Sequence, residues 1–536
     1  MATSAADLDA RILDSSRPRI NPILIIFILT IATFMEVLDT SIANVALPHI
    51  AGSLSAGQDE ASWVLTSYLV ANAIILPISG WLATFFGRKR FYMACVVIFV
   101  ASSFLCGIAT NLGMLIFFRI LQGLGGGGLA PSEQSIIADT VPVEKRGIAF
   151  AIYGLGVVFA PAIGPTFGGW ITDNYTWHWI FFINVPVGLV SLALTWYFVQ
   201  EPKSTLGERE RMQKEGFKID WIGITLIAIG IGSLEIVLDE GNREDWFESN
   251  FIVRFAVISI ISLIIGVIWE YRQKHPAVDV RMLLDRNFAS SFILLFAVGF
   301  ILFGSTFLLP LMAQTLMGYN AVTAGEVISP GGFVVMLMMP IVGGFLMPRV
   351  QARWLILFGL IVSALSLWHL SSLSLDAAYS DLAWARVYQA FGLAFLFVPI
   401  NTAAYTGIPQ GKTNNVSALM NLSRNLGGSF GIAILSTILA RRTQYHINTL
   451  GYHTTSYDPN YLNWLNKTAQ YLQQQGATAM EATQKATGII WARVLKQSAM
   501  LAFLDAYHIL MILVLCVIPL VFLLRKNKPG SGGGGH

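Results

Sequence analysis

The sequence predicts an all-α polytopic membrane protein with fourteen transmembrane helices. Hydrophobic residues make up 55% of its 536 positions and charged residues only 12%, about half the charged share of a soluble domain. The mean hydropathy is +0.62. The apolar residues also occur in runs of roughly 20 or more, the length that an α-helix needs to cross the hydrocarbon core of a bilayer.

Fourteen apolar runs are long enough to span a membrane, and an even number places both termini on the same side. In chain order, the expected spans are 22–47, 61–83, 91–110, 113–138, 147–172, 179–199, 219–239, 251–271, 288–311, 321–346, 353–373, 381–407, 413–439 and 500–524.

The distribution of Lys and Arg predicts which side holds the termini. With a cytoplasmic N-terminus, the inner segments contain 23 Lys and Arg residues. The short outer loops contain two, Arg243 and Arg254. Basic residues favour the cytoplasmic side in short loops, whereas long segments cross largely regardless of charge. We therefore expect both termini in the cytoplasm, with no cleavable signal peptide before the first span.

The segment 440–499, between the last two spans, is polar and is expected outside. Apolar residues recur there at the spacing of an amphipathic helix, at Leu462, Leu465, Ala469 and Leu472. Residues 477–499 lack proline and can extend the last span outward. Because loops of this length are usually functional or disordered, we expect a helical projection that docks a partner. The glycine-rich end of the chain is expected to be flexible.

An internal repeat indicates two duplicated six-helix halves. Two sets of residues recur at nearly the same separation, 263 or 267 positions later: Pro77, Gly80 and Arg90 as Pro340, Gly343 and Arg353, and Arg119 and Gln122 as Arg386 and Gln389. Parallel repeats of this kind are typical of transporters with a site between the halves. The expected domains are 1–200, an inserted linker and helix pair at 201–275, and 276–536.

Two acids in the first span, Glu36 and Asp39, are the first candidates for a functional site. They are three residues apart and share one helix face. A carboxylate in hydrocarbon is costly, so it should face the bundle interior. The segment can form a structural ion pair or a proton-binding site. Arg119 lies at a similar depth, roughly 10 Å below the outer surface at 1.5 Å per residue, and is the expected partner.

Further polar residues inside spans are candidates for the substrate cavity. Asn421, Arg424, Asn425 and Gly428 have the spacing of one helix face. Such a face can be an interhelical hydrogen-bond cluster or a substrate contact. The other cavity candidates are Arg386, Gln122 and Glu133. Asp505 and His508 are weaker candidates, because they lie near an outer end where they can simply be hydrated. Glu235 and Glu326 also lie near outer ends and are expected to be hydrated.

Two patterns argue against other kinds of site. The run GLGGGG, Gly123 to Gly128, matches a nucleotide-binding spacing, but it lies within a membrane span without the preceding strand that such a site needs. The three cysteines, Cys95, Cys106 and Cys516, lie in apolar runs and suggest neither a disulfide framework nor a metal site. We expect no cofactor and no nucleic-acid partner.

Five stretches resemble the fourteen-span drug:proton antiporters of the major facilitator superfamily, most closely the EmrB-type multidrug pumps. They are LDTSIANVALP (Leu38 to Pro48), GWLATFFGRKR (Gly80 to Arg90), LIFFRILQG (Leu115 to Gly123), APAIGPTFGG (Ala160 to Gly169) and WHWIFFINVPVG (Trp177 to Gly188). The resemblance implies that the Asp of the first motif is Asp39. It also implies gating or structural roles for Gly80, Gly87, Arg88, Arg90, Gly164, Pro165, Gly168 and Gly169.

One position departs from the resembled pattern. The loop motif at Gly80–Arg90 usually has an Asp where this chain has Thr84. In the family, that Asp helps to close the cytoplasmic side. Thr84 cannot form this charged contact, so the resemblance leaves open how the inner side closes.

The resemblance implies proton-driven export of small lipophilic compounds by a non-enzymatic transporter of the bacterial inner membrane. It further implies a periplasmic adaptor protein and an outer-membrane channel as partners. A facilitator or proton symporter for one solute is the alternative, against which the motif at Ala160–Gly169 argues. A membrane enzyme would need a nucleophile–base or metal constellation, and a signalling protein would leave the buried acids unexplained.

Overall fold

Every regular element in the described part of the chain is a helix. The computed structural model describes residues 22–142, 145–200, 220–408 and 412–526. The helices are α2 (Pro22–Ser53), α3 (Gln58–Phe86), α4 (Arg88–Gly107), α5 (Leu112–Gly126), α6 (Leu129–Thr140), α7 (Arg146–Asn174), α8 (Trp179–Phe182), α9 (Asn184–Phe198), α11 (Trp221–Glu240), η2 (Trp246–Glu248), α12 (Asn250–Arg272), η3 (Val280–Leu284), α13 (Arg286–Thr315), α14 (Ala321–Pro340), η4 (Ile341–Leu346), α15 (Ala352–Leu370), α16 (Tyr379–Ala404), α17 (Thr413–Gly451), α18 (Pro459–Gln474), α19 (Ala479–Val517) and η6 (Ile518–Leu523).

Thirteen helical stretches of the described residues are long and apolar enough to cross a membrane, which confirms a polytopic membrane protein. The predicted count was fourteen. The difference is the predicted span 413–439, which forms the first part of the long helix α17; α17 is not among the thirteen. The predicted N-terminal segment, most of the linker after α9 and the glycine-rich tail lie outside the described residues.

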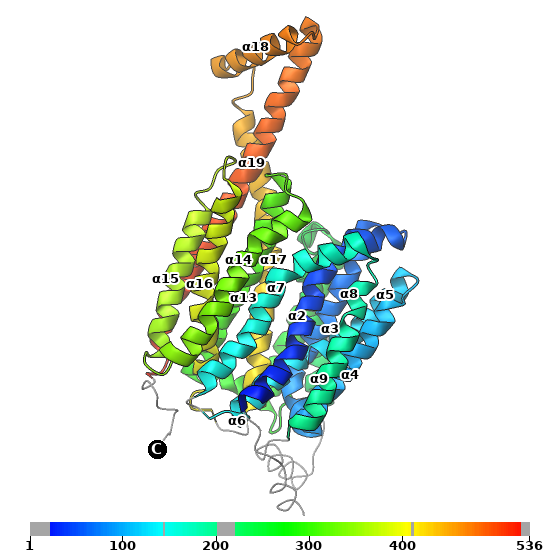
Figure 1. Cartoon of the computed structure of the whole chain (residues 1–536), viewed down its shortest axis with the longest axis vertical. Coiled ribbons are helices and arrows are strands. Elements are labelled where there is room, and N and C mark those ends of the chain that lie inside the picture. Colours follow the sequence, from blue (N-terminus) through cyan, green and yellow to red (C-terminus); the bar gives the residue numbers. More distant parts are fainter. Residues whose placement is uncertain (1–21, 143–144, 201–219, 409–411, 527–536) are drawn as a thin grey trace, which may run out of the picture.

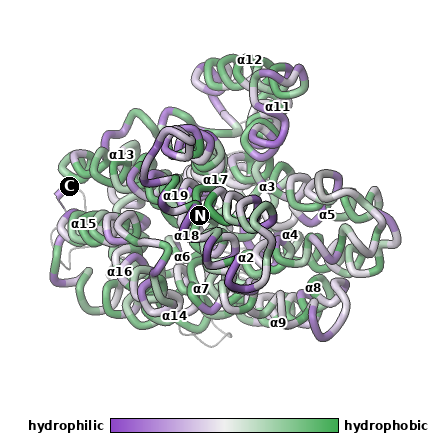
Figure 2. Tube along the Cα trace, turned by 90° about the horizontal axis from the view of Figure 1, so that it is seen from above, coloured by the Kyte–Doolittle hydropathy of each residue, from purple (hydrophilic) through white to green (hydrophobic). Residues whose placement is uncertain are grey.

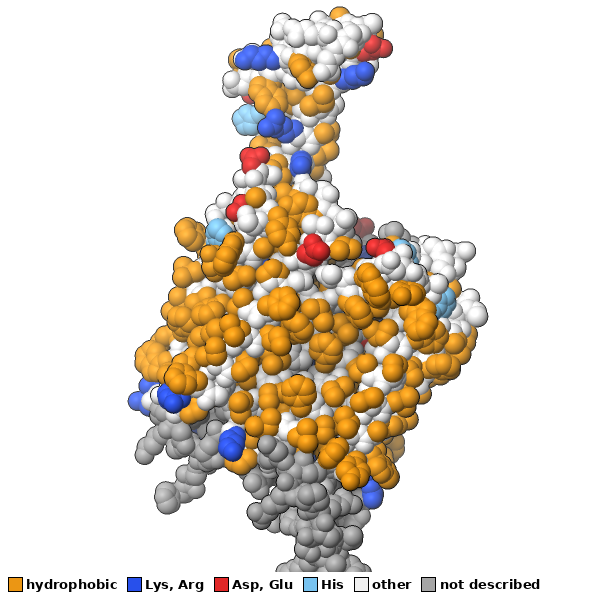
Figure 3. Space-filling model, viewed as in Figure 1, with side chains coloured by type: hydrophobic (Ala, Val, Ile, Leu, Met, Phe, Trp, Pro, Cys, Tyr) orange, Lys and Arg blue, Asp and Glu red, His pale blue; other side chains and the backbone are white. Residues whose placement is uncertain are grey.

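The helices form an elongated bundle whose side is apolar. Helix α2 packs along α7, α13 along α17, and α15 along α16, while α14 packs against α7 and α3 against α17. Figure 1 shows these helices running side by side along the long axis. On the face in Figure 3, hydrophobic side chains cover the flank of the bundle, and charged ones gather near its ends and on the projection. This pattern fits a bundle surrounded by lipid.

Helices α11 and α12 form a pair at one edge of the bundle, with α12 outermost (Figure 2). Helix α11 packs against α12, α3 and α17. The connection after α11 is also attached to α17, because Trp246 Nε1 donates to Thr437 Oγ1 at 2.9 Å. Helix α12 is apolar and largely exposed, as a lipid-facing helix should be.

The segment 440–499 forms the predicted helical projection, built from the ends of α17 and α19 with α18 between them (Figure 1). Helix α18 is amphipathic as predicted, and Ala469 packs against Ala482 and Ala486 of α19. Asp458 caps α18 by accepting from the backbone N–H of Asn460 at 2.8 Å. The pKa of Asp458 is lowered because its carboxylate accepts such backbone hydrogen bonds.

Candidate functional site

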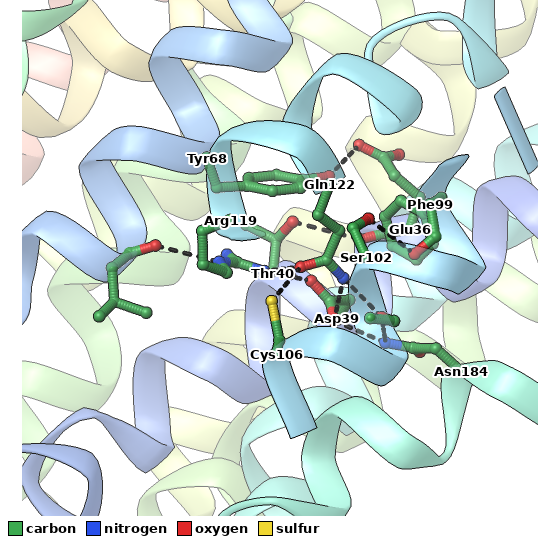
Figure 4. Close-up of polar contacts among 12 residues, drawn as sticks. Glu36, Asp39, Thr40, Tyr68, Phe99, Ser102, Cys106, Arg119, Gln122 and Asn184 are labelled. Carbon is green, nitrogen blue, oxygen red and sulfur yellow. Dashed lines mark hydrogen bonds and ion pairs between the residues drawn. The ribbon is translucent and has the colours of Figure 1, made fainter. Parts of the chain in front are cut away.

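Asp39 of α2 and Arg119 of α5 form a buried ion pair. Arg119 Nη1 lies 2.7 Å from Asp39 Oδ2, and the two residues are 0% and 2% exposed respectively. The other carboxylate oxygen, Asp39 Oδ1, accepts from Gln122 Nε2 at 3.0 Å and from Asn184 Nδ2 at 2.6 Å. Figure 4 shows these side chains converging on Asp39. The expected partnership of Asp39 and Arg119 is therefore confirmed.

The environment of Arg119 compensates its burial. Its Nε donates to the backbone carbonyl of Val64 at 3.0 Å, and its Nη1 also donates to Gln122 Oε1 at 2.8 Å. The guanidinium carbon lies 4.2 Å from the centre of the Tyr68 ring, a favourable cation–π distance. A buried charge pair is stable only when such further hydrogen bonds satisfy it.

Glu36 belongs to a neighbouring but separate hydrogen-bond group. Its Oε1 accepts from the Tyr68 hydroxyl at 3.1 Å and from Asn72 Nδ2 at 3.2 Å. Glu36 is half-buried, whereas Asp39 is fully buried. Tyr68 connects the two acids, because its ring covers Arg119 while its hydroxyl reaches Glu36 (Figure 4). A change of charge at either acid can therefore affect the other through Tyr68.

Glu133 of α6 lies deeper and makes only neutral contacts. Thr30 Oγ1 donates to Glu133 Oε1 at 2.6 Å, and Thr33 Oγ1 donates to Oε2. Glu133 is 0% exposed. Among the described residues no cation forms an ion pair with Glu133, so both carboxylate oxygens depend on threonines of α2. It does not join the group around Asp39.

The predicted polar face of α17 divides into two parts. Asn421 Nδ2 donates to Gln134 Oε1 of α6 at 2.9 Å, and Arg424 Nη1 donates to the Tyr153 hydroxyl of α7 at 3.2 Å. Arg424 also contacts the side chain of Asn425. This part is an interhelical cluster between α17 and α6–α7. The second part is apolar: a Cβ at Gly428 would meet Phe303 of α13 at 2.5 Å.

Arg386 of α16 is buried without an acidic partner among the described residues. It donates to Ser305 Oγ at 3.1 Å, Thr306 Oγ1 at 3.0 Å and Gln389 Oε1 at 2.7 Å. All three acceptors are neutral. The predicted cavity residues therefore do not form one cluster: Gln122 lies with Asp39, while Arg386 and Glu133 have surroundings of their own.

Known proteins identify the family. Residues 29–432 match the Major Facilitator Superfamily. The chain belongs to this superfamily. Multidrug export protein EmrB of Haemophilus influenzae is 38% identical over 84% of this chain and 89% of its own length. EmrB of Escherichia coli K12 is 35% identical over 95% and 96%, and the fatty acid resistance protein FarB of Neisseria gonorrhoeae is 35% identical over 95% and 97%. The chain is thus an EmrB-type member, as its motifs predicted.

Solved structures support the same fold. A double-tryptophan mutant of XylE matches with a TM-score of 0.59 and 13% identity over 95% of this chain and 97% of that one. Identity this low shows the shared superfamily fold and nothing about the substrate.

The superfamily loop motif joins the C-terminal end of α3 to the N-terminal end of α17. Asn414 Nδ2 donates to Thr84 Oγ1 at 2.8 Å, so the departure from Asp leaves an uncharged hydrogen bond at this position. Arg88 donates to Thr413 Oγ1 at 3.0 Å and pairs with Asp139. Gly80 permits this approach, because a Cβ there would lie 2.9 Å from the carbonyl of Asn414.

Most of the remaining motif residues lie at a turn or at close contacts between helices, whereas Arg90 is exposed. Gly87 separates α3 from α4 with a φ of 92°, a conformation that glycine adopts readily, and Arg90 is exposed at the start of α4. On α7, a Cβ at Gly164 would meet Ser41 of α2 and one at Gly168 would meet Ile42 of α2. Pro165 lies near Gly325 and Gly169 near Val322, both on α14.

Sequence reasoning missed two residues that contact the Asp39–Arg119 pair, Tyr68 and Asn184. Asn184 lies in the motif at Trp177–Gly188 and could have been singled out as the polar residue inside it. Glu235 was expected to be hydrated, and this expectation was wrong: it is 4% exposed and accepts from Ser429 Oγ at 2.5 Å. Glu326 is exposed, as expected.

Proposed function

We propose that the protein is a proton-driven antiporter that exports small lipophilic drugs and toxic compounds by alternating access. The multidrug export proteins among its relatives support export, and the superfamily is one of transporters rather than enzymes. The buried Asp39–Arg119 pair supports proton coupling, because an acid inside a membrane span is otherwise a costly feature. No nucleotide-binding motif in a suitable context was found in the sequence, so an ion gradient would supply the energy.

We propose fourteen spans in two six-helix halves, 1–200 and 276–536, with α11 and α12 as an inserted pair from 201–275. Helix α17 would be the remaining span. Contacts between the proposed halves support this division, since α3 packs on α17 and α7 on α14. In this arrangement both termini are cytoplasmic and the projection is periplasmic, in a bacterial inner membrane.

Asp39 would take up a proton from the outer side and release it inside as the halves move. A proton can drive this movement only through its different affinity for the two arrangements. The observed arrangement, in which Asp39 accepts from Arg119, Gln122 and Asn184, suits the carboxylate. In an arrangement open to the outer side, water would reach Asp39 and the carboxylate would be protonated before the halves move back.

Asp39→Asn tests this role directly. Asparagine is nearly isosteric and cannot titrate, so the variant should insert and bind substrate but show no proton-driven efflux in proteoliposomes. The direction of flux under an imposed pH gradient also separates an antiporter from the alternative, a facilitator or symporter. Efflux at the wild-type rate in the variant would show that the ion pair is structural.

The substrate would be neutral or weakly acidic rather than a permanent dication. Arg386 has only neutral acceptors among the described residues, and a cation near an uncompensated arginine in a low-dielectric site is repelled. The relative named for fatty acid resistance supports this preference. Binding of lipophilic weak acids and of quaternary dications to the purified protein checks it; tight binding of dications alone would contradict it.

The projection would dock a periplasmic adaptor that leads to an outer-membrane channel. Its three helical segments extend well beyond the bundle (Figure 1), and a length of chain this ordered is not needed for a simple connection. Deleting residues 452–490 should leave the protein in the membrane but abolish its cross-linking to the adaptor. Undiminished cross-linking would place the docking surface elsewhere.

A further inference from the structure

The last turns of α11 carry three acidic side chains that face other helices. Glu235 accepts from Ser429 of α17 at 2.5 Å. One turn later, Thr66 of α3 donates to Glu240 at 3.0 Å and also to Asp239. Helix α11 therefore touches α17 through one carboxylate and α3 through two others. It bridges the helices that, in the function proposed above, belong to different halves of the transporter.

Glu235 is the acid of this group with the most enclosed position. Glu235 and Glu240 are 4% and 5% exposed, but Glu240 has a cation beside it, the half-exposed Arg243 at 3.4 Å, and Glu235 has none among the described residues. The hydrogen bond from Ser429 fixes one carboxylate oxygen of Glu235. Ser429 also donates to the carbonyl of Asn425 at 3.3 Å, so its hydroxyl is shared between α17 and α11.

The charged groups around Glu235 do not neutralise it. On α11 itself, Asp239 is the charged neighbour that acts on it. From α3, the side chains that reach this end of α11 are Ser62 and Thr66, which do not titrate. Arg254 of α12 is exposed. No ion pair to Glu235 is present in the described parts of the chain.

Arg424 of α17 does not supply the missing cation. It lies more than one turn before Ser429 along α17 and donates to Tyr153 and Asn425. A carboxylate buried without a cation costs several kcal/mol in a membrane, whereas the neutral acid is far cheaper to bury. The proton occupancy of Glu235 and the packing of α11 against α17 are therefore linked.

We propose that Glu235 is a second proton-binding residue, which couples its protonation to the opening of the interface between the inserted helix α11 and α17. This inference rests on the proposed alternating access, but it concerns a site distinct from Asp39. The two acids share no hydrogen-bond partner: Asp39 is bound by Arg119, Gln122 and Asn184, and Glu235 by Ser429.

The coupling between the protonation of Glu235 and the packing of α11 has a direction. A proton on Glu235 favours the packed interface, because the neutral side chain can remain buried beside Ser429. Loss of the proton favours an arrangement in which the outer part of α11 separates from α17 and the carboxylate meets water. By linkage, opening of this interface promotes proton release, and closing it promotes proton uptake.

Cysteine labelling measures this opening without transport. Thr437 contacts Trp246 next to α11 and is partly covered by it, so Thr437→Cys should react faster with a membrane-impermeant maleimide when the two segments separate. Cys516→Ser removes the exposed native cysteine, and the other two are buried. Because the thiolate is the form that reacts with maleimide, each labelling rate is divided by that of a small free thiol at the same pH. In this background we expect the corrected rate to be about tenfold higher in alkaline than in acidic buffer, a ratio equivalent to a free-energy difference of one pKa unit.

Glu235→Gln should make the corrected labelling rate independent of pH, because glutamine keeps an acceptor for Ser429 but cannot titrate. Glu326→Gln is the matched control: it removes an exposed acid of α14 and should leave the pH dependence unchanged. Ser429→Ala should retain the pH dependence while raising the rate at every pH. Labelling that does not depend on pH in the parent protein, or depends on it equally in Glu235→Gln, overturns the proposal.

Infrared spectroscopy gives a second, independent readout. In pH-difference spectra of the protein in lipid nanodiscs, a protonated carboxyl group has a C=O band separate from those of carboxylates. We expect Glu235→Gln to lose one such titrating band and Ser429→Ala to shift it. Asp39→Asn should keep the Glu235 band, so a failure of the proposed role of Asp39 remains distinguishable from a failure at Glu235. An unchanged spectrum in Glu235→Gln contradicts the proposal.

Discussion

Arg119 of α5 and Arg386 of α16 occupy matching places in the internal repeat, yet their charges are compensated differently. Each donates to the glutamine three residues later, at 2.8 Å from Arg119 and 2.7 Å from Arg386. Arg119 then meets the carboxylate of Asp39 at 2.7 Å. Arg386 meets hydroxyl groups instead, including that of Thr306 at 3.0 Å.

The sequence separation makes the contrast sharper. Thr306 follows Asp39 by 267 residues, the same separation as between Arg119 and Arg386. One copy of the repeat thus holds an acid beside its arginine, and the other holds a threonine at the corresponding position. The scaffold of arginine and glutamine has been kept in both, while the group that can bind a proton is present in one.

Replacing each arginine by methionine should give the largest difference between the two regions, measured as the loss of protein stability. Arg119→Met leaves Asp39 buried without a cation and should destabilise the protein by about 3–5 kcal/mol. Arg386→Met removes a charge that has no buried counter-charge among the described residues, and should change stability by less than about 1 kcal/mol. Thermal unfolding of the purified variants measures both effects.

The double variant Asp39→Asn with Arg119→Met is the control for this comparison. Because it removes both charges, it should recover part of the stability lost in Arg119→Met alone. Equal losses in Arg119→Met and Arg386→Met would mean that the carboxylate does not distinguish the two regions energetically.

Placing an acid beside Arg386 should give this arginine the same kind of charged partner that Arg119 has. Thr306→Asp puts a carboxylate within reach of Arg386 Nη2, which now donates to the threonine hydroxyl. If Arg386 attracts acidic substrates, efflux of a lipophilic weak acid should fall about tenfold relative to a neutral compound, equivalent to ~1.4 kcal/mol. Thr306→Asn has a similar shape without the charge and should leave the ratio unchanged. An equal loss in both variants would indicate a steric effect.

Part of this architecture could be predicted from the sequence. Hydropathy gives the position of each span along the chain. The number of residues between a side chain and the end of its span gives the depth of that side chain in the membrane. These two quantities were enough to pair Asp39 with Arg119. The helical projection at 440–499 followed from the spacing of its apolar residues and from the lack of proline before the last span.

The rest depended on which helices are neighbours, which depth alone does not determine. Asn184 reaches Asp39 from α9, and Asn414 reaches Thr84 from α17, across sequence separations that no local pattern encodes. Glu235 lies near the outer end of its helix, where water is expected. Packing of α11 against α3 and α17 buries it instead.

The smallest expected effect tests whether the acid next to Asp39 modulates the difference between the two regions. Glu36 precedes Asp39 by three residues, and residues near Arg386 have no counterpart to it: position 303, at the same separation from Thr306, is Phe303. Glu36→Gln keeps an acceptor for Tyr68 and Asn72, so packing should be preserved. Removing its negative charge makes the Asp39 proton easier to lose, and the pH optimum of efflux should move to lower pH by up to about one unit.

Efflux rates in proteoliposomes over a series of pH values measure this shift, with partial activity retained. Tyr68→Phe is the matched control, because it removes the hydroxyl that reaches Glu36 but keeps the ring over Arg119. If the charge of Glu36 acts on Asp39, Glu36→Gln moves the optimum and Tyr68→Phe moves it less. An unmoved optimum in Glu36→Gln would show that Asp39 titrates independently of its neighbour, and that the arginine and its hydrogen-bond partners alone set the behaviour of this region.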